Sequence, residues 1–381
     1  MLIIKHIAIF VIMNNHLDIL IARIATLQSK GDVYFAEGLF EAQRVNPLIG
    51  YKRNDETIFF TAIITFTLQR LSHLLSVESQ KIVSSITAKS IKNYPDFENK
   101  DGLKTYNFWK TKPSRHFPNG YVFGRFTHFK IPDDVDDTAM VYLTSPHTPT
   151  DILWLKDKLT QHANLSKLQI KNTFKEYKSL RAYSTWFGKN MYIEFDVAVL
   201  CNLMYWIFEN KLPHNQHDSD SLAYIRSTIE TDQYLNQPFA VAHQYPRTVP
   251  IVYHVARLMG AFQIEALEPI RAKLIGDIRR LLTQPQPRMD RIVLQTSLMR
   301  LGIYDFNFES VEDISTANFE DFYFFIAGLL TAYQNPVLYQ MARWPLFHIR
   351  WQCEAHCWTL VAEYVALQSS HKKPNFAKTP N

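Results

Sequence analysis

Four carboxylates lie within five residues, since Asp133, Asp134, Asp136 and Asp137 follow Pro132 and an apolar run comes next. Proline cannot continue an incoming helix, and Asp is favoured at helix caps and in first turns. We therefore expect the acids at the start of a helix whose body is buried. Like charges this close raise the pKa of at least one carboxyl, although the helix N-terminus opposes that shift. A carboxyl that keeps its proton near neutral pH can act as a strong general acid.

The rest of the chain must position this group, and its apolar residues recur mostly at helical spacing. Convincing strand alternation is rare, so we predict an all-α fold. An aromatic, loop-like segment over residues 94–130 leads to the acids, and lysines recur at helical spacing within residues 167–189. The other predicted helices are 16–29, 54–75, 76–93, 137–144, 149–163, 196–209, 220–234, 250–261, 265–283, 290–301, 319–333 and 355–368.

These helices are of two kinds. Some are amphipathic, such as residues 265–283, whereas others, such as residues 197–208 and 322–330, are apolar nearly all round. A helix that is apolar all round must be covered on every side, and the two kinds roughly alternate along the chain. We therefore expect an α/α toroid, an (α/α)6-barrel-like double ring of about a dozen helices. The inner helices would begin near Asp137, Asp196, Pro250, Phe322 and Ala355.

Length and composition limit the other possibilities. The 381 residues are 47% hydrophobic and 14% aromatic, enough for a large core. We expect one domain over residues 1–381, with a polar tail from residue 370. Residues 1–13 are too short and too interrupted to span a bilayer. They would be a disordered or mis-started N-terminus, with Met13 opening the domain, or a signal peptide.

Charge and cysteine content indicate the surroundings of the protein. The formal charge of +5 is too mild to argue for a nucleic-acid partner. Three cysteines make no disulfide framework and favour a reducing compartment. We expect a cytoplasmic protein, either free or in peripheral contact with a membrane, and the sequence leaves the oligomeric state open.

The acidic group also resembles a known signature. Residues 134–139, Asp-Val-Asp-Asp-Thr-Ala, resemble the D-x-D-D-T-A motif of class II terpene cyclases, within the terpenoid cyclase and protein prenyltransferase superfamily. Gln28, Gly31 and Phe35 resemble the Q-x-x-G/aromatic turns of these toroids. The resemblance implies a toroid with the motif at the start of an inner helix. Such cyclases usually carry a second helical domain, with the pocket between the two, and 381 residues leave little room for it.

The resemblance implies protonation-initiated cyclisation of an isoprenoid, either a prenyl diphosphate or a squalene-like polyene. Asp136 matches the proton donor of the family, Asp134 and Asp137 match the carboxyls that tune it, and Thr138 would be a local hydrogen-bonding group. The protonation step needs no cofactor, although Mg²⁺ would accompany a diphosphate substrate. Phe, Tyr and Trp, which number 26, 19 and 7, would shield the carbocation by cation–π attraction or would simply fill the core.

Three further residues are candidates for contacting the substrate. Asp196 opens an apolar helix, and Tyr253 and His254 lie just inside the helix that begins near Pro250. Residues at the starts of inner helices would face the same mouth as Asp136. Each of the three would equally serve as a cap or as a core group.

A second function would use the same acids as metal ligands. Asp133, Asp134 and Asp137 also satisfy D-D-x-x-D, which binds magnesium and a diphosphate in class I terpene synthases and prenyltransferases. The second metal motif of those enzymes places three oxygen ligands at i, i+4 and i+8. Glu312, Thr316 and Glu320 approximate it, and oxygen ligands suit magnesium.

The remaining candidates are less specific. Lys167, Lys171, Lys175 and Lys178 would hold a diphosphate, touch anionic lipid or form a solvated helix face. The set His348, Cys353, His356 and Cys357 would ligate zinc or lie in the core. A third function from another class is a toroid without catalysis that binds a lipid or a protein.

Overall fold

The computed structural model describes residues 16–114, 130–188, 191–328 and 335–371, and most of these are helical, with one small sheet. The predicted N-terminal segment 1–13 lies outside the described residues, as do residues 372–381 of the predicted tail. Ser370 and His371, which the sequence places in that tail, belong to the last helix instead.

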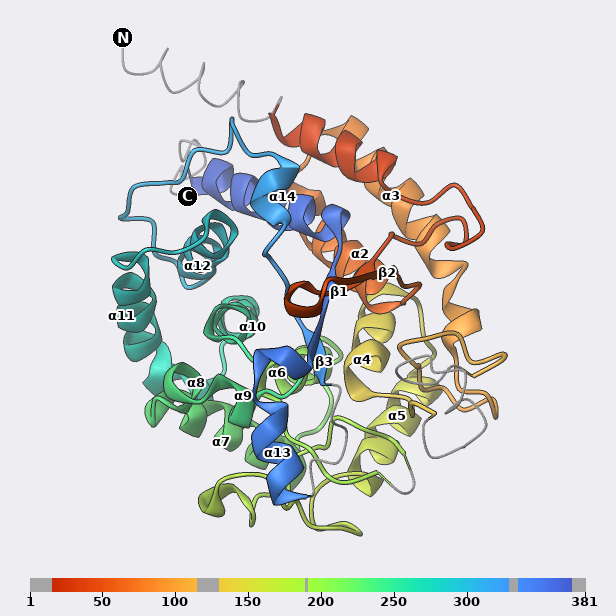
Figure 1. The fold of residues 1–381 in the computed structure, drawn as a ribbon, viewed down its shortest axis with the longest axis vertical. Helices are drawn as coiled ribbons and strands as arrows, with labels where there is room; N and C mark the ends of the chain where they lie inside the picture. The colour runs from red at the N-terminus through yellow and green to blue at the C-terminus, as the bar shows by residue number, and fades with distance from the viewer. Residues whose placement is uncertain (1–15, 115–129, 189–190, 329–334, 372–381) are drawn as a thin grey trace, which may run out of the picture.

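Six helices pack against one another in a closed circuit (Figure 1). In order of contact they are α2 (Phe59–Leu71), α4 (Val135–Thr144), α6 (Val197–Glu209), α10 (Thr248–Ala261), α12 (Arg288–Arg300) and α14 (Glu354–His371), which returns to α2. Every residue of α4 and most residues of α6 and α10 are buried, as expected for helices that are apolar on all sides. Four of the five predicted inner helices belong to this circuit.

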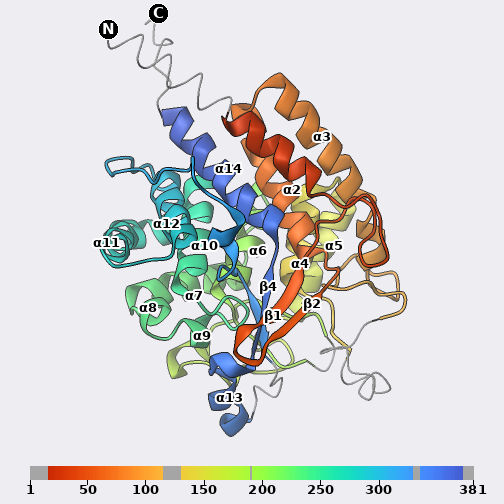
Figure 2. The ribbon, with the colours of Figure 1, turned by 45° about the horizontal axis from the view of Figure 1, so that its top comes forward.

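A second set of helices lies outside the circuit. α3 (Val77–Ile91) packs on α2, α7 (Gln216–Glu230) on α6 and α11 (Arg271–Leu282) on α12, while α5 (Pro149–Gln161) lies beside α4 (Figures 1 and 2). The chain thus alternates between the two sets. Residues 16–26 form another peripheral helix. The short helices are α8 (Gln233–Asn236), α9 (Pro238–Val241) and α13 (Pro336–Ala342).

The predicted all-α class is wrong in one respect: the described residues include a small sheet, so the fold is mostly α. The sheet is antiparallel, in the order β2-β1-β4-β3, and its strands are β1 (Gln43–Asn46), β2 (Tyr51–Asn54), β3 (Ile326–Gly328) and β4 (His348–Gln352). Strands this short give no usable alternation in the sequence. They bring the segment before α2 beside the segment before α14, so the two ends of the described chain share one sheet.

The predicted inner helix over residues 319–333 is wrong. A 3-10 turn, Thr316–Phe319, precedes extended chain that enters β3, and residues 329–334 lie outside the described residues. A short run of aromatic and β-branched residues fits a buried strand as well as a buried helix. Pairing with β4 decides the outcome here, and the Trp351 N–H also donates to the Phe325 carbonyl at 3.2 Å.

The lysine-rich helix expected between residues 167 and 189 is also wrong, apart from a 3-10 turn at Lys175–Tyr177. The side chain of buried Asn164 donates to the carbonyls of Lys178 and Leu180 and accepts from the Ile170 N–H. These bonds hold the backbone as an irregular loop, since a polar side chain can offer the chain an alternative to helical bonding. The four lysines therefore form no helical stripe.

Candidate active site

The acids lie at the start of a buried helix, as predicted. Asp134 is the N-cap of α4, and its carboxylate accepts the Asp137 backbone N–H at 2.7 Å. The Thr138 hydroxyl donates to the Asp134 carbonyl at 2.6 Å and accepts the Tyr106 N–H at 2.9 Å, so its predicted local hydrogen bonding is confirmed. The backbone at Asp134 pairs with Tyr106 on one side and Trp186 on the other. Three chain segments therefore fix the origin of the helix.

Asp133 and Asp134 face different surroundings because the chain before α4 is extended, and side chains alternate along extended chain. Asp133 is held by three polar side chains: it accepts from Thr105 Oγ1 at 2.6 Å, from Asn107 Nδ2 at 3.3 Å and from Asn99. Asp134 instead belongs to the wall of a cavity that does not include Asp133. The three carboxylates of the D-D-x-x-D alternative therefore do not converge on one point, and they do not fit a magnesium site.

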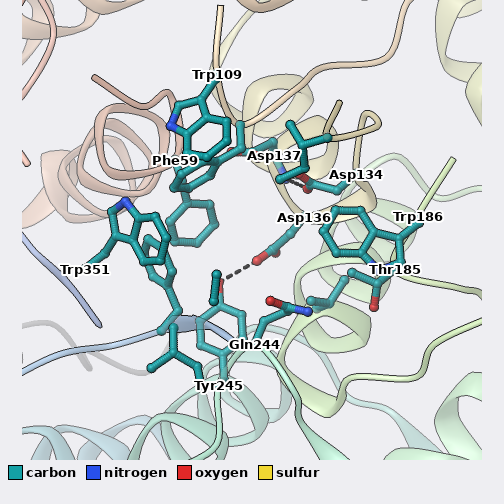
Figure 3. Close-up of a pocket in the computed structure, with 16 residues that line it drawn as sticks. Phe59, Trp109, Asp134, Asp136, Asp137, Thr185, Trp186, Gln244, Tyr245 and Trp351 are labelled. Carbon is teal, nitrogen blue, oxygen red and sulfur yellow. Dashed lines mark hydrogen bonds between the residues drawn. The ribbon is translucent and has the colours of Figure 1, made fainter. Parts of the chain in front are cut away.

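The cavity beside α4 is aromatic and mostly apolar (Figure 3). Its volume is about 80 Å³, which is small beside typical ligand pockets of about 300–1,000 Å³. In this conformation it has room for the end of a hydrocarbon chain but not for a whole one. The lining residues are Phe59, Phe108, Trp109, Ile131, Asp134, Asp136, Asp137, Thr185, Trp186, Val199, Gln244, Tyr245, Phe325, Ile326, Ala327 and Trp351.

Asp136 points into this cavity, where it accepts a hydrogen bond from Tyr245 (Figure 3). Tyr245 donates its hydroxyl to Oδ2 at 2.5 Å, and Asn202 on α6 donates its Nδ2 to Oδ1 at 2.5 Å. Burial raises the pKa of Asp136 to about 6, although these two bonds and the charge of Arg257 oppose the shift. Asp136 is therefore a carboxyl that still carries a proton in mildly acidic solution, up to about pH 6.

Asp134 and Asp137 form a pair of their own. Burial raises the pKa of both carboxyls; the charge of Asp134 raises the pKa of Asp137 further, whereas the charges of Asp136 and Asp133 raise that of Asp134. A hydrogen bond between the side chains favours the proton on Asp137, raising its pKa and lowering that of Asp134. The groups that bond to Asp136 are Tyr245 and Asn202, so the tuning of Asp136 by Asp134 and Asp137 stays a prediction.

Sequence analysis missed the residues that hold Asp136. Arg257 on α10 is buried, bonds to the Asn202 side-chain oxygen and lies over the rings of Phe66 and Tyr253 at 5.1 and 5.3 Å. The series Arg257–Asn202–Asp136 therefore links three helices of the circuit. One signal was available: Asn202 and Arg257 are polar residues within apolar helical runs, where an unpaired polar group is costly.

A buried ion pair orients the aromatic wall opposite Asp136. Asp55 follows β2 and accepts the indole N–H groups of Trp109 and Trp351, each at 2.9 Å. Arg44 on β1 lies 3.5 Å from Asp55, and both side chains are 1% exposed. The small sheet thus fixes two of the rings that face the cavity.

Asp196, Tyr253 and His254 do not line this cavity. Asp196 caps α6, bonding to the Ala198 and Val199 N–H groups, and it also accepts the Gln244 N–H at 2.8 Å. The Tyr253 hydroxyl donates to Glu363, and the His254 ring packs against Tyr245 with a centroid separation of 4.8 Å. All three therefore lie one layer behind the cavity wall, where Asp196 and His254 support Gln244 and Tyr245.

The other candidate ligands stay apart. Glu312 and Glu320 are exposed, and only a 3-10 turn lies between them, so they and Thr316 share no helix face. His348 bonds to the Ala342 carbonyl, whereas Cys353, His356 and Cys357 are buried at the start of α14. Within the described residues, no three His, Cys, Asp or Glu side chains are grouped to hold a metal ion.

In comparisons with models of protein families, with curated proteins and with solved structures, the chain matches none. No helix among the described residues combines the length and apolarity needed to cross a membrane.

Proposed function

We propose that this chain is an enzyme resembling class II terpene cyclases, which cyclises an isoprenoid after protonation by Asp136. The observation that carries the proposal is a buried carboxyl with a raised pKa that points into an aromatic cavity. An alkene is a feeble base, so its acid must be neutral, dry and held in place. Burial favours the neutral form of Asp136 and keeps it away from solvent, and its bonds to Tyr245 and Asn202 hold it in place.

The chemistry is balanced without a cofactor. The O–H bond of Asp136 breaks, and its proton forms a C–H bond with the terminal alkene carbon, using the π electrons of that alkene. The resulting cation takes the π pair of the next alkene, which forms the carbon–carbon bond of a ring. Loss of a proton from the last cation restores an alkene, and Asp136 regains its proton from solvent. Substrate and product are therefore isomers.

The walls of the cavity suit the cation. Phe59, Trp109, Tyr245 and Trp351 present rings to the space beside Asp136 (Figure 3), and aromatic faces attract cations most strongly where water is excluded. The apolar lining also keeps water from capturing the cation.

The architecture supports the same assignment. The closed circuit of six helices, with further helices outside it, is what an α/α toroid requires, and we assign the chain to that fold. The motif acids open α4, a helix of the circuit. In this chain the small sheet and the aromatic loop would supply the cavity wall that a second helical domain supplies elsewhere.

The class I alternative receives less support from the geometry. It requires Asp133, Asp134 and Asp137 to share a metal, yet Asp133 is bonded to Thr105 and Asn107, and Asp137 is paired with Asp134. The non-catalytic alternative leaves the raised pKa of Asp136 without a role.

Incubation with farnesyl diphosphate, geranylgeranyl diphosphate and squalene, followed by mass spectrometry, tests the proposal. We expect a cyclic isomer of one of them, with any diphosphate retained and with turnover of squalene unaffected by EDTA. Release of pyrophosphate that depends on both magnesium and Asp133 would instead establish the class I reaction. A protein that binds isoprenoids without converting any of them would establish the non-catalytic function.

A further inference from the structure

A second, larger hollow adjoins the cavity on the other side of the extended segment 131–134. Its volume is about 690 Å³, and Ile131 and Trp186 belong to the walls of both spaces. Asp133 faces this second space, whereas Asp134 and Asp136 face the first. We call the second space the basic recess, after its lysines Lys100, Lys130, Lys158 and Lys167.

The basic recess has a surplus of positive charge. Lys100 is paired with Asp101 at 2.6 Å, and the carboxyl of Asp133 stands against Lys130, Lys158 and Lys167 in the lining. Among the described residues, Lys130, Lys158 and Lys167 have no ion-pair partner. These three ammonium groups therefore remain available to an anion.

His162 lies among these lysines without adding charge. Burial lowers the pKa of His162 to about 4, and the charges of Lys158 and Lys167 lower it further. Its ring packs edge-on against Phe187, which also lines the recess. The recess thus offers a neutral imidazole and the amide of Gln161 beside the lysines, all of which can bond to phosphate oxygens.

The two spaces suit the two ends of one substrate. Protonation at Asp136 requires the terminal alkene in the small cavity, and that alkene is the end farthest from the head group of a prenyl diphosphate. A cavity of about 80 Å³ cannot hold the whole chain, so the chain must continue into an adjoining space. The basic recess, which shares Ile131 and Trp186 with the cavity wall, is the space that we assign to the rest of the chain.

We propose that the basic recess binds the diphosphate of a prenyl diphosphate whose far end reaches Asp136, with Lys158 and Lys167 as its principal ligands. The inference rests on the proposed function and narrows its substrate from isoprenoids in general to prenyl diphosphates. It also accounts for the expected retention of the diphosphate, since the head group would lie across the segment 131–134 from the acid.

Isothermal titration with inorganic pyrophosphate tests the recess without requiring turnover. We expect binding to the wild-type protein and to Asp136→Asn, and at least about tenfold weaker binding to the double variant Lys158→Gln/Lys167→Gln, because each charged hydrogen bond is strong. Lys175→Gln is the matched control, an exposed lysine outside the recess, and it should bind as the wild type does. Lys158 is half-buried and Lys167 exposed, and thermal melts of each variant report folding.

The outcomes separate the two proposals. Equal affinity in the double variant, or no binding of pyrophosphate to the wild type, would overturn the recess assignment while a cyclised squalene would still support protonation by Asp136. Conversely, pyrophosphate binding that depends on both lysines, with no isoprenoid cyclised, would support the recess as an anion-binding site and would contradict the proposed cyclase activity. Co-sedimentation with phosphatidic acid vesicles that is lost in the double variant, without pyrophosphate binding, would assign the lysines to a lipid head group instead.

Discussion

Asp133 and Asp136 are three residues apart and both are buried, yet they face different spaces. Asp133 faces the basic recess, where Thr105, Asn107 and Asn99 saturate its oxygens. Asp136 faces an aromatic, mostly apolar cavity, and burial raises its pKa to about 6. The difference teaches that the number of acids in the motif matters less than the side of the chain on which each acid lies. Extended backbone before the helix turns Asp133 away from the cavity, whereas Asp136 lies in the first turn of α4 and faces it.

The largest expected effect is that of Asp136→Asn, which keeps the shape and removes the transferable proton. General acid catalysis contributes about 10²–10⁴-fold, and we expect at least that loss of turnover. The variant should remain folded. Because the pKa of Asp136 is about 6 in the folded protein and about 3.9 in the unfolded chain, ionisation of this carboxyl lowers the stability of the wild type as the pH rises through this interval. Asn does not ionise, so the variant should be more stable than the wild type at pH 7.5. Turnover assays and thermal melts measure both effects. A folded variant with near wild-type turnover would remove Asp136 from the mechanism.

The aromatic wall should matter next. Trp351→Leu removes a ring that faces Asp136 and is oriented by Asp55. A desolvated cation–π contact is worth about 2 kcal/mol, so turnover should fall by about 30-fold, with more water-captured product. Trp344→Leu is the control, since Trp344 is 57% exposed and lies outside the cavity. Equal losses in both variants would show a general effect on folding rather than cation stabilisation.

The pH dependence of turnover should show how the hydrogen bond from Tyr245 affects Asp136. The protonated form is the donor, so turnover should fall about tenfold per pH unit above about pH 6. The Tyr245 hydrogen bond lowers this pKa, so Tyr245→Phe should move the falling limb to higher pH and reduce the maximal rate about tenfold. Tyr253→Phe loses a similar hydroxyl–carboxylate bond outside the cavity. Tyr253→Phe should not change the pH above which turnover falls. A shift equal to that of Tyr245→Phe would contradict the role of Tyr245 as the partner that lowers the pKa of Asp136.

The smallest effect on catalysis is expected for substitution of Asp133. Asp133→Asn should change turnover of folded protein by no more than a few-fold, while the loss of charge-assisted bonds lowers the free energy of unfolding by about 1–3 kcal/mol. Chemical denaturation and turnover at equal concentrations of folded protein measure the two quantities. Under class I metal binding the order reverses, and Asp133→Asn would be the more damaging substitution.

The sequence predicted the parts of the site that depend on local rules. Pro132 and the acids indicated the start of α4, and Asp196 indicated the start of α6, because caps follow from nearby residues. Residues 322–330 were assigned to a helix, because strand β3 depends on pairing with β4, which no local pattern reveals.

The partners of the acid were beyond local rules altogether. Asn202 and Tyr245 bond to Asp136 across 66 and 109 positions of the chain, and Arg257 bonds to Asn202 across 55. Only the packing of α4, α6 and α10 brings them together. A polar residue inside an apolar helix indicates that a hydrogen-bonding partner exists, but the sequence does not identify that partner.

The most direct test of the central claim is the reaction in D₂O, followed by mass spectrometry of the cyclised product. Because the Asp136 carboxyl exchanges its proton with solvent, protonation by this residue predicts one deuterium in each product molecule, on a carbon of the former terminal alkene. Asp136→Asn should form no labelled product above background. A cyclic product without deuterium, formed together with free pyrophosphate, would contradict protonation and show that the reaction begins by ionisation of the diphosphate.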